Sequence, residues 1–217
     1  MYKYTRQDTK KAFYVPIDWC DVTLEKYIGF YKIIKDVEPE ELSEKLFNDM
    51  SLFHSIISYW VGFDSAKISY TDKIDIFNKI SFLFTQIEYT KMDGFAHNGI
   101  VYHLPESKKD YYGNSLPLAK ATFSEIVECF ELEKATTFIN ALPYILGILC
   151  KPHGEKYNDQ KVSDRAEDFK TLPMNLVWHT CFFLTNSKRL FNQIIKQSLE
   201  VQAREAALID MAGIMHL

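Results

Sequence analysis

The amino-acid sequence predicts a mainly α fold, with two similar three-helix units, a small β-hairpin between them and a long C-terminal helix. Apolar residues recur at the three- and four-residue spacing of a helix face over most of the chain. The 8 glycines and 7 prolines among 217 residues are too few for the many turns of an all-β sandwich. A helical pattern also recurs about 100 residues later, which indicates that the chain carries one unit twice.

The two copies of this repeat agree in order and in residue type. Residues 15–25, VPIDWCDVTLE, correspond to residues 116–125, LPLAKATFSE. Further along, five apolar positions of the first copy align with five of the second: Ile68, Ile76, Phe77, Ile80 and Leu83 with Phe169, Val177, Trp178, Cys181 and Leu184. Both alignments have an offset of about 100 residues, so the copies are nearly equal in length.

The chain is expected to comprise five segments: an extended N-terminal arm (1–20), a first helical unit (21–92), a hairpin and loop (93–115), a second helical unit (116–186) and a C-terminal helix (187–217). In the first unit, helical spacing predicts helices over 22–35, from Pro39 to about Trp60, and from about Thr71 to Ile87. Asp21 is the expected N-cap of the first helix, and Gly62 is the expected stop of the second.

Between the two units the periodicity changes, and residues 95–104 are expected to form a small hairpin. Asn98-Gly99 is the strongest short-range signal for a hairpin turn because both residues tolerate positive φ. Two strands alone are marginal in water, so the hairpin must lie on the helices or on a partner. Residues 105–115 are expected to form an exposed loop.

In the second unit, helices are expected over 121–132, 134–150 and 171–185, with a polar loop over 151–165. Pro143 should kink the middle helix or mark its true start. Beyond this unit lies a heptad-like seam formed by Leu190, Ile194, Gln197, Val201, Arg204, Leu208, Met211 and Met215. Such a helix either docks on the core of its own chain or joins copies and partners, and the seam favours neither alternative.

Composition and charge exclude several classes of protein. The net charge of −4 and the isoelectric point near 5.9 argue against a nucleic-acid-binding protein, which should carry a basic stripe. No stretch approaches the roughly 18 apolar residues of a membrane span, and the four cysteines lack the dense framework of secreted domains. We therefore expect an intracellular protein that binds neither nucleic acid nor a membrane.

One combination of residues resembles a metal site. Cys150 and His153 together with His179 and Cys181 have the composition of a structural zinc site. However, His179 and Cys181 are two residues apart on a predicted helix and point about 200° apart around its axis, so both cannot bind one ion. We expect neither a metal nor a cofactor.

The signals for catalysis are equally weak. The sequence has no nucleophile elbow, no glycine-rich phosphate loop and no Walker lysine. His97 and His103 flank the hairpin turn, where they could pair across the strands. We expect no catalytic residue; an enzyme would have to use the polar loop that contains His153, Tyr157 and Asp159.

A likeness to a known class of protein is carried by residues 15–24, 99–102, 121–125, 148–152 with Tyr157, and 169–173 followed by Phe182-Phe183. In order and residue type, these segments resemble small helical bacteriophage proteins, the tail assembly chaperones in particular. The resemblance implies a non-enzymatic role, in which the protein binds hydrophobic segments of tail proteins or forms part of the virion. The resemblance assigns no functional role to any individual residue, and residues 187–217 are not part of it.

We therefore expect a non-enzymatic protein of bacteriophage assembly or of the virion, which contacts other phage structural proteins or a second copy of itself. It would be present in the host cytoplasm during assembly and, as a virion part, in the particle. The expected contact residues are Tyr102, Tyr111, Tyr112, Leu190, Ile194, Val201 and Leu208. The alternatives are a phage regulatory or anti-defence protein that binds a host factor, and a small helical enzyme.

Overall fold

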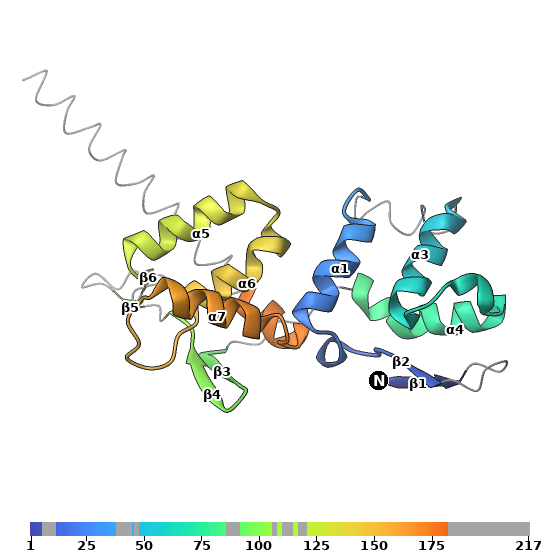
Figure 1. Cartoon of the computed structure of the whole chain (residues 1–217), viewed down its shortest axis with the longest axis horizontal. Helices are drawn as coiled ribbons and strands as arrows, with labels where there is room; N and C mark the ends of the chain where they lie inside the picture. Colours follow the sequence, from blue (N-terminus) through green and yellow to red (C-terminus); the bar gives the residue numbers. More distant parts are fainter. Residues whose placement is uncertain are drawn as a thin grey trace, which may run out of the picture.

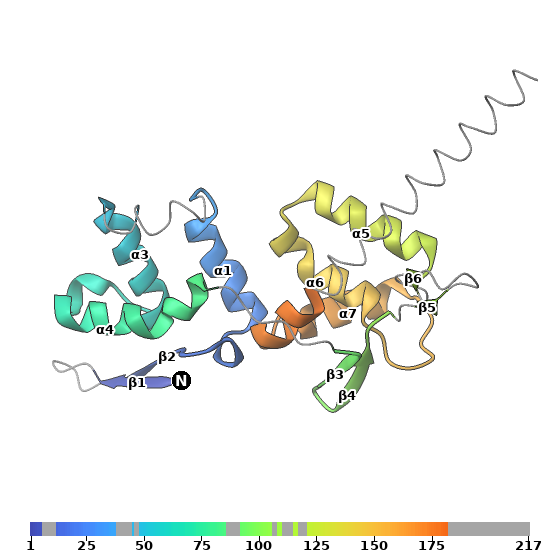
Figure 2. The same cartoon turned by 180° about the vertical axis from the view of Figure 1, so that it is seen from behind.

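The computed structural model describes residues 1–5, 12–37, 45, 48–85, 92–105, 108–109, 115–116 and 121–181. Within this part the protein is mainly helical, which confirms the predicted fold class. The helices form two groups that lie side by side, and Figure 2 gives the same arrangement from behind (Figures 1 and 2). The helices are α1 (Leu24–Ile34), α3 (Met50–Val61), α4 (Tyr70–Ile80), α5 (Phe123–Ala135), α6 (Phe138–Leu149) and α7 (Asp159–Phe169). Residues 174–181 are helical as well.

Short antiparallel hairpins accompany the helices. The strand pairs are β1 (Tyr2–Thr5) with β2 (Ala12–Val15), β3 (Gly94–His97) with β4 (Ile100–His103), and β5 (Lys108–Lys109) with β6 (Ser115–Leu116). The β3–β4 hairpin confirms the turn predicted from sequence, since Asn98 and Gly99 both have positive φ, 46° and 78°. The N-terminal residues form the β1–β2 hairpin and a 3₁₀ turn, η1 (Trp19–Asp21), so the prediction of an extended arm is wrong for the described part of 1–20.

Helix α1 begins two residues later than predicted. Thr23 is its N-cap, and its hydroxyl accepts a hydrogen bond from the Lys26 amide (3.3 Å). Asp21 belongs to η1 and has other partners: its carboxylate contacts the Met1 ammonium (2.7 Å) and accepts from the Ile17 amide (3.1 Å). The prediction of Asp21 as the cap is therefore wrong, because these contacts draw its side chain away from the helix.

Helix α3 ends at the predicted residue, but the single helix predicted from Pro39 to Trp60 is interrupted. Gly62 adopts φ 78° and donates its amide to the Ser58 carbonyl (2.9 Å), as a left-handed C-cap does. At the other end, Asp49 has non-helical backbone angles and caps the amides of Ser51 and Leu52 (2.9 and 3.1 Å). The single helix predicted to run up to Trp60 is therefore interrupted at Asp49, where a new helix begins.

Helix α4 is shorter than predicted. Ser69 caps it by accepting from the Asp72 amide (3.1 Å), and the α-helix ends at Ile80. The chain continues as a 3₁₀ turn, η3 (Ser81–Phe84), and residues 86–87 of the predicted helix lie outside the described part. A second 3₁₀ turn, η2 (Ser65–Lys67), joins α3 to α4.

The second unit contains the predicted helices α5 and α6 and one helix, α7, that was not predicted. α5 begins with a reciprocal capping box, in which Thr122 accepts from the Glu125 amide (3.3 Å) and Glu125 accepts from the Thr122 amide (2.7 Å). Pro143 lies inside α6 and does not mark its start. The predicted polar loop over 151–165 is wrong beyond Asn158, which caps α7 by accepting from the Lys161 amide (3.0 Å).

The two units meet where α1 begins. The Leu24 amide donates to the Leu172 carbonyl (2.8 Å), the Glu25 amide donates to the Lys170 carbonyl (2.9 Å), and an isolated bridge joins Thr23 to Pro173. Residues 170–172 thereby satisfy two first-turn amides of α1 that have no partner within their own helix. We call residues 22–25 and 170–174 the inter-unit joint.

Apolar and aromatic side chains surround this joint. Val22, Leu24, Leu172 and Met174 are all buried. Next to them, the Trp178 ring lies 5.8 Å from that of Trp19 and 5.3 Å from that of Tyr27, both edge-to-face. The joint is therefore part of the continuous core and not a flexible connection between separate domains.

Candidate functional site

Tyr102 is the only predicted contact residue within the described part of the chain, and it is buried. Its side chain is 2% exposed, and its ring lies 4.8 Å from that of Phe169 on α7 and 5.6 Å from that of Phe95 on β3. Burial raises the pKa of its hydroxyl. Tyr102 is therefore covered by its own chain, whereas the prediction of a partner contact assumes an exposed side chain. Tyr111, Tyr112, Leu190, Ile194, Val201 and Leu208 lie outside the described residues.

The apolar face of helix α5 is wider than the part that the core buries. Ile126 and Cys129 are buried on the side toward the core. On the adjacent side, Phe123 is 71% exposed and Val127, one turn later, is 38% exposed, while the partly buried Phe130 packs against the core between them and Ile126. We call Phe123, Val127 and Phe130 the α5 outer face; helix α5 lies at the edge of the second unit in Figure 1.

The i, i+4, i+7 spacing of the α5 outer face is that of side chains that anchor a helix in the groove of a partner. Helix α4 carries a row of the same spacing, in which Tyr70 is 64% exposed, Ile74 is 38% exposed and Phe77 is partly buried. Each row widens the apolar face of its helix beyond the part that the core covers. The capping box at Thr122 holds the start of the α5 row in place.

The tip of the β3–β4 hairpin is fastened to the end of α7. The Asn98 amide nitrogen donates to the Asp168 carboxylate (2.6 Å), and His97 Nε2 lies 3.0 Å from the Thr171 hydroxyl. His97, Asp168 and Thr171 resemble a catalytic triad in composition only, since Nε2 is the imidazole atom near both the carboxylate and the hydroxyl. The cluster therefore holds the hairpin in place. His97 and His103 lie at opposite ends of the hairpin and do not pair across the strands.

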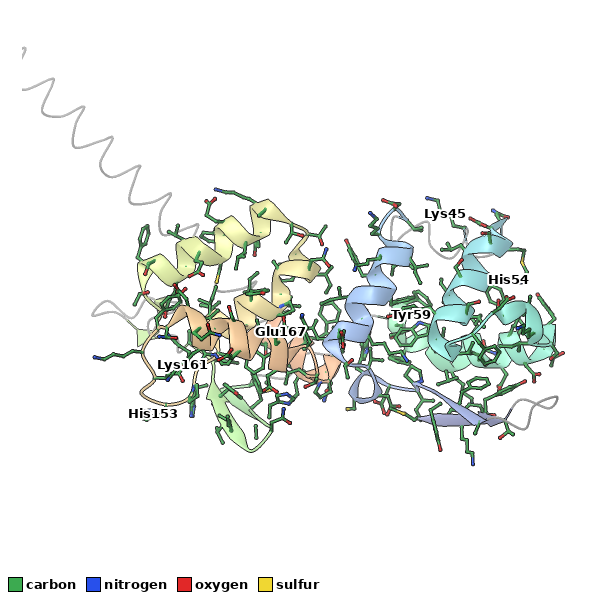
Figure 3. The ribbon with its side chains drawn as sticks, viewed as in Figure 1. Lys45, His54, Tyr59, His153, Lys161 and Glu167 are labelled. Atoms are coloured by element: carbon green, nitrogen blue, oxygen red, sulfur yellow. The ribbon has the colours of Figure 1, made fainter. Side chains whose placement is uncertain are left out.

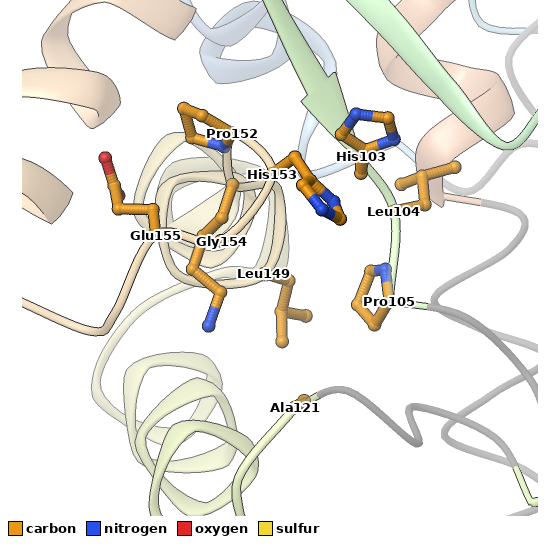
Figure 4. Close-up of a pocket in the computed structure, with 10 residues that line it drawn as sticks. His103, Leu104, Pro105, Ala121, Leu149, Pro152, His153, Gly154 and Glu155 are labelled. Carbon is orange, nitrogen blue, oxygen red and sulfur yellow. The ribbon is translucent and has the colours of Figure 1, made fainter.

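A pocket of about 360 Å³ lies between the end of β4, the end of α6 and the start of α5 (Figure 4). The polar side chains on its wall are those of His103, Lys151, His153 and Glu155. An isolated bridge joins the backbones of His103 and Lys151, with N–O distances of 2.9 and 3.4 Å, and fixes β4 beside the chain that leaves α6. Because of this bridge, the rings of His103 and His153 lie 6.0 Å apart.

Two carboxylates belong to this region, and both are paired. Glu125 is 1% exposed; its Oε1 lies 2.5 Å from the Lys151 ammonium. Glu155 receives hydrogen bonds from the Arg165 guanidinium and from the Lys161 ammonium (3.3 Å). Burial alone would raise the pKa of Glu155, but the hydrogen bond from Arg165, together with Lys161, holds that pKa below its ordinary value.

The residues considered for metal binding and catalysis are not brought together. Cys150 and Cys181 are buried, whereas His153 lies at the pocket, and no group of three potential ligands occurs among the described residues. The Tyr157 hydroxyl donates to the Glu128 carboxylate of α5 (2.5 Å), and Asp159 lies in the first turn of α7. Of the residues proposed for an enzyme, only His153 therefore lines the pocket.

Across the described ranges, none of the helices combines the length and apolar character needed to cross a membrane. Comparison with protein families, with curated proteins and with solved structures finds no match to this chain. The assignment of a function therefore depends on the geometry of this chain and on the resemblance of its sequence segments.

Proposed function

We propose that this protein acts through protein–protein contacts, without catalysis, as an assembly factor or structural component of a bacteriophage particle. The supporting observation is the α5 outer face, where Phe123 is largely exposed and Val127 is partly exposed. Full burial of an exposed Phe side chain contributes about 1.5–3 kcal/mol, so a partner that covers Phe123 gains most of this free energy and a smaller amount from Val127.

The partner surface is expected to be an apolar groove or the apolar face of a helix. The row Phe123, Val127 and Phe130 is short, and a helix packed against it would contact two turns of α5. Glu131 is exposed beside this row and ion-paired to Lys134 (2.7 Å), which gives the contact a charged rim. A charged rim around an apolar centre is typical of protein interfaces.

The phage context is supported by the resemblance of the sequence segments to tail assembly chaperones and small virion proteins. Other structural proteins of the phage, or a second copy of this chain, are accordingly the proposed partners. Such a protein would work in the host cytoplasm during assembly and, as a virion component, remain in the particle.

The test uses the full chain with two variants matched in position. Phe123→Ser changes the first residue of α5, and Tyr70→Ser changes the first residue of α4, which is 64% exposed and begins the corresponding row, Tyr70, Ile74 and Phe77, on the first unit. The immobilised proteins are incubated with lysate of phage-infected cells, and retained phage structural proteins are identified by mass spectrometry. Light scattering of the purified chain measures self-association.

We expect the wild-type chain and Tyr70→Ser to retain the same phage protein or to self-associate equally. Phe123→Ser should weaken this binding by roughly tenfold or more, as loss of a central aromatic anchor does. A monomeric wild-type chain that retains no phage protein would overturn the proposed function. Equal binding by both variants would show that the α5 outer face takes no part in the proposed function.

A further inference from the structure

The pocket beside β4 has more hydrogen-bond donors than acceptors available to a ligand. The acceptors on and behind its wall are already in use: Glu125 accepts from Lys151 and from the Thr122 amide (2.7 Å), and both oxygens of Glu155 are hydrogen-bonded. A ligand entering the pocket would therefore meet no unpaired carboxylate on these two residues.

The donors are only partly used. The Lys151 ammonium carries three N–H groups and is bonded to Glu125 through one of them. The ring nitrogens of His103 and His153 make no hydrogen bond to any described residue, and each imidazole carries at least one N–H. Both histidine side chains and Lys151 line the same cavity.

The local charge is positive. Glu125 neutralises Lys151, but Glu155 faces two cations, Arg165 and Lys161, which leaves one positive charge in excess before either histidine is protonated. Arg165 is 6% exposed, and its Nη2 has no partner among the described residues. This buried cation lies behind Glu155 and adds to the field at the pocket, where desolvation strengthens its effect.

The pocket is also fixed in shape before any ligand enters. The backbone of Lys151 is bridged to His103, and its ammonium is held by the buried Glu125. Leu104 and Leu149 supply an apolar wall. Convergent donors on an apolar, preformed wall are characteristic of sites for small ligands, and about 360 Å³ is at the lower end of their volumes.

We propose that this pocket binds the oxyanion group, carboxylate or phosphate, of a small molecule with an apolar body. The ammonium of Lys151 and the imidazoles of His103 and His153 hold the oxyanion, while Leu104 and Leu149 contact the apolar body. The site borders the start of α5 at Ala121 but includes no residue of the α5 outer face, and it does not depend on the function proposed for that surface.

The experiment is a calorimetric titration of the full chain with phenyl phosphate, benzoate and benzyl alcohol. Benzyl alcohol has the apolar ring without the anion, and the two anions distinguish phosphate from carboxylate. The test variant is His153→Ala, which removes an exposed imidazole and leaves the core intact. Lys134→Met is the control, because it removes an ammonium at the far end of α5 from Thr122. Thermal unfolding of each variant verifies its fold.

We expect at least one of the two anions to bind and to raise the unfolding temperature, and benzyl alcohol to bind at least roughly tenfold more weakly. His153→Ala should weaken anion binding by roughly tenfold at unchanged unfolding temperature, and Lys134→Met should leave it unchanged. Absence of binding by both anions at 10 mM, or equal binding by wild type and His153→Ala, would overturn the proposal.

Discussion

The hydroxyl of Tyr59 on α3 donates a hydrogen bond to the backbone carbonyl of Lys26 on α1, with a distance of 2.6 Å. Figure 3 places Tyr59 between these two helices. The contact requires a residue without a side chain at Gly29, because a Cβ there would lie 2.3 Å from the Tyr59 hydroxyl. A glycine inside α1 lowers helix propensity, and here it permits the close crossing of α1 and α3.

Substitution of Gly29 by alanine should therefore destabilise the protein, although alanine is the better helix former. We expect a loss of about 1–3 kcal/mol in the free energy of unfolding, measured by urea denaturation. Tyr59→Phe removes the clashing oxygen, so Gly29→Ala should cost less in that background. A Gly29→Ala variant as stable as wild type would show that the helices can separate without loss.

The buried ion pair of Glu125 and Lys151 should matter far more than an exposed pair on the same helix. Glu125→Gln leaves the Lys151 ammonium, 17% exposed, without its charged partner, and we expect a loss of about 2–4 kcal/mol. Glu131→Gln breaks the exposed pair with Lys134 and should cost less than about 0.5 kcal/mol. Equal losses in urea denaturation would contradict this ranking.

The stability contributed by Glu155 should decrease in acid. Its pKa is lower in the folded protein than in the unfolded chain, so its contribution is complete above the ordinary value of 4.5 and is lost as the pH falls through the folded pKa. We expect the difference in unfolding free energy between wild type and Glu155→Gln to be largest above about pH 5 and to shrink below it. A difference that stays constant from pH 6 to pH 3 would refute the linkage.

The cysteines should divide into one reactive and three unreactive thiols. Burial raises the pKa of Cys129 and Cys181 to about 12 and that of Cys150 as well. Partial desolvation and the nearby Asp18 also raise the pKa of Cys20, but its side chain is exposed to the reagent. With Ellman's reagent at pH 8, we expect one fast thiol in the native protein and four in guanidinium. Cys20→Ser should abolish the fast phase; its persistence would show that a core thiol is accessible.

Sequence reasoning succeeded where local chemistry decides the structure. Asn98-Gly99 specified its turn because few residues tolerate positive φ, and Gly62 ended α3 for the same reason. The hydrophobic spacing located α1 and α5 to within a few residues.

The sequence misleads where polar composition hides a local pattern and where distant residues decide the structure. Helix α7 lies where the polar composition of residues 151–165 predicts a loop, although Val162, Ala166 and Phe169 recur at helical spacing after a capping Asn158. Its buried face also includes Arg165, which is tolerated there because Glu155 and the Gly147 carbonyl (2.9 Å) bind it. Similarly, the pocket depends on the bridge between His103 and Lys151, which no local pattern encodes.

The inter-unit joint has a consequence for synthesis of the chain on the ribosome. The first-turn amides of α1 at Leu24 and Glu25 receive their partners from Leu172 and Lys170, about 150 residues later. At roughly 5–20 residues per second, translation delivers those partners about 7–30 s after α1 has been made. During that interval the nascent chain exposes Val22, Leu24 and the aromatic rings around them, which makes early binding by a cellular chaperone advantageous for this protein.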